Sequence, residues 1–139
     1  MDAKLILWPL LLQVLLTLTL FILLGKRKAV AFKEGKVDRQ KAALDNSAWP
    51  DEVLKVSNSI QNQFQTPVLF YILSLALFVS GGVTTSVLVV AWLYAVSRLV
   101  HAYIHVGSNY VPARFRVFVL GCLSLIALLA MLLIHLTTI

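Results

Sequence analysis

Two stripes of polar side chains interrupt a chain that is otherwise strongly apolar. The first lies in the stretch NSIQNQFQTP, where four amides at helical spacing share an arc about 100° wide: Asn58, Gln61, Asn62 and Gln65. The second covers an arc about 80° wide and holds a phenol, a guanidinium, two imidazoles and an amide: Tyr94, Arg98, His101, His105 and Asn109. Such side chains donate and accept hydrogen bonds, so the two stripes predict a pocket for a polar ligand.

The arginines indicate that a negatively charged group lies near the pocket. Arg98 belongs to the second stripe and Arg114 follows it, and a guanidinium near a membrane needs an anion such as a carboxylate, a lipid phosphate or a ligand. No Asp or Glu occurs after Glu52. Either the acidic pair Asp51 and Glu52 reaches these arginines, or the anion comes from outside the chain.

Other kinds of chemistry find little support. His101 and His105 are four residues apart and could share a metal ion, but a third ligand is missing, so we expect no metal site. Cys122 lies in an apolar run and is interpreted as a small core residue. Nucleophile motifs, glycine-rich phosphate loops and paired carboxylates are absent, so any catalysis must stabilise an anion on a bound cosubstrate.

The elements that must position these residues are membrane spans. Of the 139 residues, 60% are hydrophobic and 13% charged, which is typical of an integral membrane protein. Four apolar segments predict one all-α, four-helix transmembrane domain over residues 1–139, with spans at about 4–25, 53–80, 85–106 and 112–137. The first span is too long for a signal sequence and is expected to remain. Pro67 predicts a kink in the second span.

The distribution of basic residues predicts orientation. The net charge is +6, and seven of the twelve basic residues fall in the loop 26–52: Lys26, Arg27, Lys28, Lys33, Lys36, Arg39 and Lys41. Basic loops flank membranes on the cytoplasmic side, so we expect this loop and the loop before the last span to be cytoplasmic and both termini to lie outside. Because the charge is juxtamembrane, we expect the lipid bilayer, and not nucleic acid, as its partner.

The two stripes should then meet. The second and third spans form a hairpin across the membrane, and both stripes lie near its cytoplasmic end. Polar side chains at this depth are costly if they face lipid, so they should line a protein interior or a wet cavity. A purely structural role remains open for Asn58 and Gln61, because amides also hydrogen-bond across packed helices.

The stretches NQFQTPVLFY and SRLVHAYIHVGSNYVPARFRVF resemble the MAPEG family, the membrane-associated proteins in eicosanoid and glutathione metabolism, over the whole chain. Five residues resemble the pattern of its bacterial branch, namely Arg98, His101, Asn109, Pro112 and Arg114, and the chain is similar to microsomal glutathione transferases. The resemblance implies a homotrimer with glutathione as cosubstrate between subunits. It also implies that Arg114, at the position of the family's arginine before the fourth helix, stabilises the thiolate, while the two stripes bind glutathione.

Two departures from the family pattern bear on function. With Asn62 as the family asparagine, Asn58 stands in place of an arginine and Gln65 in place of a glutamate. Each charge-assisted hydrogen bond replaced by a neutral one loses about 1 kcal/mol, so glutathione binding could weaken ~30-fold. We therefore expect a thiol-dependent transferase or peroxidase acting on lipophilic molecules, or alternatively a non-catalytic member that binds a lipid or fatty acid. A small multidrug transporter is disfavoured, because the first span lacks an acidic residue.

Overall fold

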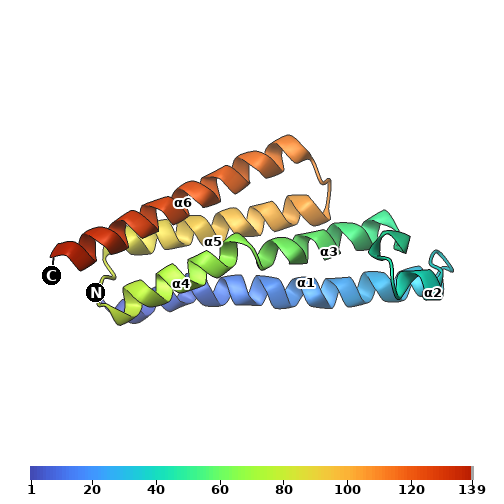
Figure 1. Ribbon diagram of the computed structural model, residues 1–139, viewed down its shortest axis with the longest axis horizontal. Helices are drawn as coiled ribbons and strands as arrows, with labels where there is room; N and C mark the ends of the chain where they lie inside the picture. Colours follow the sequence, from blue (N-terminus) through green and yellow to red (C-terminus); the bar gives the residue numbers. More distant parts are fainter. Residues whose placement is uncertain (139) are drawn as a thin grey trace.

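The structure, a computed structural model, describes residues 1–138 and within that range consists of helices and their connections. Four long helical segments lie side by side in an elongated bundle (Figure 1). In chain order the elements are η1 Ala3–Ile6, α1 Leu7–Lys33, α2 Arg39–Ala42, η2 Asn46–Ala48, α3 Asp51–Gln63, α4 Thr66–Val79, α5 Thr85–Val106 and α6 Val111–Thr138. The segments η1–α1, α3–α4, α5 and α6 are each long and apolar enough to cross a membrane, which confirms the predicted fold class.

Helix α1 is longer than the sequence analysis predicted. The expected span ended at Gly25, whereas the helix continues through the basic stretch to Lys33. It ends where Gly35 adopts a φ of 67°, and the N–H of Lys36 then donates to the carbonyl of Ala31 over 3.0 Å. This is a glycine-dependent helix stop, and no earlier residue of α1 provides one. The first part of the predicted loop is therefore helical.

The second span is divided into α3 and α4, as Pro67 predicted. Proline has no N–H to donate to the carbonyl one turn earlier, so the hydrogen-bond ladder is interrupted at this point. Helix α3 ends at Gln63 and α4 begins at Thr66, with Pro67 in its first turn. The break lies beside the predicted pocket and allows the side chains before and after it to point in different directions.

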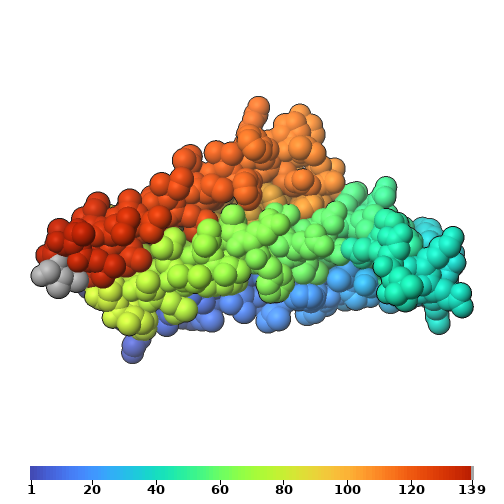
Figure 2. Space-filling view, viewed as in Figure 1, coloured from blue at the N-terminus to red at the C-terminus, as the bar shows by residue number. Residues whose placement is uncertain are grey.

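Helix α5 lies at the centre of the packing and contacts α1, α3 and α6. One side of it carries buried aromatic and polar residues, with Tyr94 stacked on Phe70 of α4 at a ring-centroid distance of 4.4 Å. Helix α6 packs against α5 and α4 and leans away from α5 toward the turn that joins them (Figure 1). The space-filling view shows the elongated surface of the bundle (Figure 2). Many large apolar side chains are exposed on the outside of the bundle, as expected for a protein surrounded by lipid.

A buried amide pair joins the first two spans. The Nε2 of Gln13 in α1 donates to Oε1 of Gln63 in α3 over 2.6 Å, and both side chains are fully buried. Gln63 in turn donates to the carbonyl of Ser59 over 3.3 Å. Because lipid offers no competing hydrogen bonds, this pair fixes the register of α1 against the end of α3.

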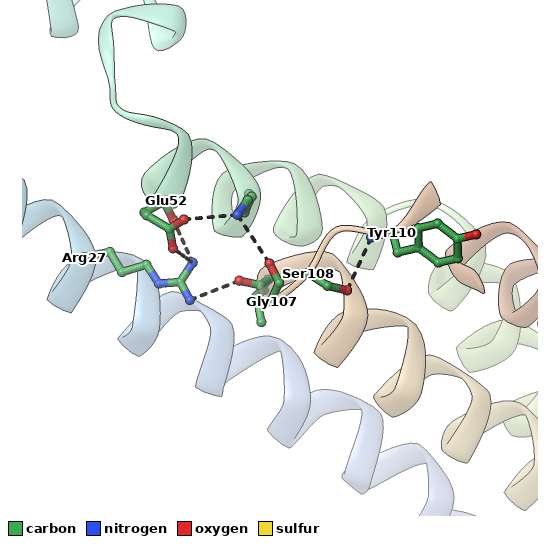
Figure 3. Close-up of polar contacts among 7 residues, drawn as sticks. Arg27, Glu52, Gly107, Ser108 and Tyr110 are labelled. Atoms are coloured by element: carbon green, nitrogen blue, oxygen red, sulfur yellow. Dashed lines mark hydrogen bonds and ion pairs between the residues drawn. The ribbon is translucent and has the colours of Figure 1, made fainter. Parts of the chain in front are cut away.

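A three-helix clamp, formed by Arg27, Glu52 and Lys55, fastens one end of the bundle (Figure 3). Arg27 of α1 donates to the carbonyl of Glu52 over 2.8 Å and to that of Val106 over 3.1 Å. Lys55 of α3 binds the Glu52 carboxylate over 3.0 Å and donates to the carbonyl of Gly107 over 3.3 Å. Carbonyls at the end of α5 thus receive donors from two other helices, as helix C-termini require.

Candidate functional site

A cavity of about 220 Å³ lies between the end of α3, the helix break, α5 and the start of α6. Both predicted stripes contribute to it, the first through two amides and the second through an imidazole, and α6 adds a guanidinium and an apolar wall. The lining residues are Asn62, Gln65, His101, Val111, Arg114, Phe115 and Phe118. The structure therefore brings part of each stripe together with Arg114 around one hollow.

Next to this cavity the bundle holds polar groups that have no partner within the described residues. Arg98 is 1% exposed, and neither its Nε nor its Nη2 makes a hydrogen bond. His101 and His105 are each 3% exposed, and their Nδ1 atoms also lack a partner. A buried donor without an acceptor costs about 1–3 kcal/mol, and buried polar groups are normally satisfied. These groups are therefore available to a bound molecule that offers hydrogen-bond partners.

The acidic pair does not supply that acceptor. Glu52 is engaged in the three-helix clamp, with its carboxylate 3.0 Å from Lys55 and 3.6 Å from Arg27. Asp51 is exposed at the start of α3. Among the residues that the structure describes, no carboxylate lies within ion-pair distance of Arg98 or Arg114. The sequence left two sources for the anion, the pair Asp51 and Glu52 or a molecule outside the chain. Only the second source is consistent with this geometry.

Arg114 is oriented by the turn that precedes α6. Its Nη1 donates to Oδ1 of Asn109, a residue with a φ of 55° whose own N–H donates to the carbonyl of Ile104 over 2.7 Å. Asparagine tolerates this left-handed conformation better than most residues. Asn109 therefore positions the arginine and does not itself line the cavity. Arg116, two residues further on, is exposed and lies outside the lining.

Other members of the stripes lie outside the cavity. Asn58 and Gln61 are exposed on α3 and do not line the cavity. Tyr94 is also outside the lining of the cavity. Its side chain is buried, and its hydroxyl donates to Oγ1 of Thr66 over 3.3 Å. Arg98 and His105 are buried and do not line the cavity. The rings of His105 and His101 are nearly perpendicular, and their centroids are 5.7 Å apart.

The sequence analysis did not identify the apolar wall of the cavity. Val111, Phe115 and Phe118 come from consecutive turns of α6, and the Phe118 ring lies 6.1 Å from that of His101. Their i, i+4, i+7 spacing was visible in the sequence, but in a helix that is apolar all round it does not distinguish one face from another. Within residues 1–138 no group of three metal-ligating side chains occurs, and the imidazole pair stands without further ligands.

Comparison with known families now bears on this arrangement. Searches against curated proteins and against solved structures gave no match. The sequence model of the MAPEG family matches residues 5–134, which include all four spans and the whole lining of the cavity. The chain belongs to the MAPEG family, a family of integral membrane proteins that includes glutathione transferases and related proteins.

Proposed function

We propose that this protein is a membrane-embedded enzyme that uses glutathione or a related thiol to modify lipophilic molecules. It would transfer the thiol to an electrophile or reduce a lipid hydroperoxide. The observation that carries the proposal is the pair of guanidiniums, one lining the cavity and one buried behind it with two unpartnered nitrogens. A thiol peptide with two carboxylates supplies the anions that these groups lack.

In this proposal Arg114 stabilises the thiolate. A fixed cation beside the sulfur lowers the thiol pKa, and the thiolate is the nucleophile. In a transfer reaction the thiolate forms the new bond to carbon as the leaving group departs with its electron pair, and the thiol proton passes to solvent. In the peroxidase reaction two thiols reduce the hydroperoxide to an alcohol and water and form one disulfide.

Other residues at the cavity would hold the rest of the cosubstrate. Asn62, Gln65 and His101 line it and would hydrogen-bond a peptide backbone, and Arg98, buried one turn before His101, would receive a carboxylate. The apolar wall includes Phe115, which is 64% exposed, so a lipophilic substrate can approach along it from the bilayer.

We further propose that the functional unit is a homotrimer with the site at the boundary between subunits. Asn58 and Gln61 support this, because they are exposed, do not line the cavity of their own chain and are available to contact a ligand or a side chain of a neighbour. The basic loops would face the cytoplasm, with both termini outside. In that orientation the cavity opens toward the compartment where thiols are reduced.

A second function, binding of a lipid or fatty acid without catalysis, is favoured by one observation. Glutathione carries an ammonium group, and no carboxylate lines the cavity or lies among the unpartnered groups beside it. A cavity with one cation, two amides and an apolar wall is also suited to a carboxylate on a hydrocarbon chain. The two functions share an anion at Arg114 and differ in whether a thiolate forms.

The deciding experiment compares variants of two neighbouring arginines. Purified protein is mixed with glutathione, the ultraviolet absorbance of the thiolate is recorded, and turnover is measured with an aryl halide. Arg114→Ala should remove the thiolate signal, whereas Arg116→Ala, an exposed arginine of the same helix, should leave it unchanged. Absence of signal and turnover in the wild type and in Asn58→Arg/Gln65→Glu alike would exclude the enzyme, and a fatty acid that binds only with Arg114 intact would then establish the second function.

A further inference from the structure

A second cavity lies at the other side of the three-helix clamp and takes no part in the proposed reaction. It has a volume of about 340 Å³ and is formed by the last turns of α1, the start of α3 and the residue before it. Its lining combines five charged residues with an aliphatic base: Lys26, Arg27, Glu34, Lys36 and Glu52 around Val30, Ala31, Pro50 and Val53. We call it the headgroup cavity.

The depth of this cavity corresponds to a membrane boundary. The apolar part of the first span runs from Leu5 to Leu24, and Lys26 is the first charged residue after it. At 1.5 Å per residue, the distance from Leu5 to Lys26 is about 32 Å, which matches a hydrocarbon core of ~30 Å. Lys26 therefore lies at the level of lipid phosphates. Helix α1 continues beyond this level to Lys33, so the cavity is walled by helix in the headgroup layer.

The charges of the lining leave one cation without a partner. Glu52 pairs with Arg27, and Glu34 pairs with Lys36. Lys26 makes no ion pair among the described residues and is exposed at the mouth. Three cations and two carboxylates give the lining a net charge of +1, which is complementary to a single phosphodiester. A zwitterionic headgroup brings no net charge and leaves Lys26 uncompensated.

We propose that the headgroup cavity binds an anionic phospholipid with one phosphodiester, such as phosphatidylglycerol. The unpaired Lys26 contacts the phosphate, Lys36 adds a second contact while remaining paired with Glu34, and the glycerol part lies on the aliphatic base. The aliphatic base offers no hydrogen bond to a free phosphate ion. The membrane, by contrast, presents the lipid at high local concentration. The lipid, and not free phosphate, is therefore the proposed ligand. Arg27 also holds the clamp, so the bound lipid would lie directly against the contacts that fasten α1, α3 and α5.

The test is native mass spectrometry of the full chain, released from nanodiscs containing phosphatidylglycerol and phosphatidylcholine. The wild type should retain phosphatidylglycerol selectively. Each basic residue at a membrane surface contributes enough attraction for roughly a five-fold change in affinity, so Lys26→Gln/Lys36→Gln should weaken retention about 25-fold. The matched control Lys33→Gln/Lys41→Gln removes the same charge from the same basic segment, outside the lining, and should retain the lipid like the wild type.

Three results would overturn the proposal. Equal retention of both lipids by the wild type would show that there is no headgroup preference. Equal losses in the lining and control variants would show that the attraction is diffuse. Displacement of the lipid by millimolar glycerol 3-phosphate would show that the cavity is a site for soluble phosphate. Circular dichroism of each variant establishes that the helices are intact, and none of these readouts depends on thiol chemistry.

Discussion

Replacing Arg98 with methionine should stabilise the ligand-free protein while removing its capacity to bind an anion. Two nitrogens of the buried guanidinium lack partners, and each unsatisfied donor costs about 1–3 kcal/mol, which gives about 2–6 kcal/mol in total. Replacement of buried ionic groups by apolar residues of similar volume stabilises proteins by about 1–4 kcal/mol. Methionine retains most of the length of the side chain, so we expect a gain of about 2–4 kcal/mol for Arg98→Met.

The assay is reversible unfolding in mixed micelles, where the mole fraction of dodecyl sulfate is raised and helicity is followed by circular dichroism. The wild type should become more stable when thiol or fatty acid is added, whereas Arg98→Met should not respond. Arg98→Lys serves as the control, because it keeps a buried charge and should show no gain. If Arg98→Met is less stable than the wild type without ligand, the guanidinium is satisfied within the protein and the argument for an external anion fails.

Further substitutions test the packing of the bundle. Gln13→Leu leaves Oε1 of Gln63 without its donor and should lower the free energy of unfolding by about 1–2 kcal/mol in the same assay. Adding Gln63→Leu should restore most of this loss. If Gln13→Leu causes no loss, the amide pair is dispensable. Gly82→Ala should cost about 1–3 kcal/mol, because a Cβ there would lie 2.8 Å from Cδ2 of His135, whose ring contacts the carbonyl of Ser80. Gly25→Ala, which meets nothing within 4 Å, should instead gain about 0.5–1 kcal/mol, and equal effects at the two glycines would refute the steric reasoning.

The fold could be predicted because its determinants are local in sequence. Four long apolar runs separated by polar or glycine-containing connections require four spans, and Pro67 requires an interruption in the second. The end of α1 could not be predicted in this way, because the loss of apolar residues after Gly25 marks the end of the predicted membrane span and not the end of the helix. The backbone ends its helix at Gly35, where a left-handed residue is required, and charged residues before that point are compatible with helix.

The candidate site could be predicted only in part. Helical spacing placed Asn62 and Gln65 on one stripe and His101 on the other, and these residues do line one cavity with Arg114. Spacing alone could not show that Asn58 and Gln61 lie outside the cavity, because the part of the stripe that borders it depends on how α3 packs and on where the helix breaks before Pro67. The roles of these residues in binding or catalysis remain predictions.

Helix α6 differs from the other long helices in how it is held. The three-helix clamp joins α1, α3 and α5, whereas α6 contacts α5 and α4 and diverges from α5 toward the turn at Asn109 (Figure 1). Phe115, Phe118 and Arg114 therefore lie on the wall of the cavity that the clamp does not hold, opposite helices that it does hold. A small outward tilt of α6 would admit a bulky molecule from the side and carry the arginine with it. The movement that opens the cavity would therefore also withdraw the Arg114 guanidinium from it.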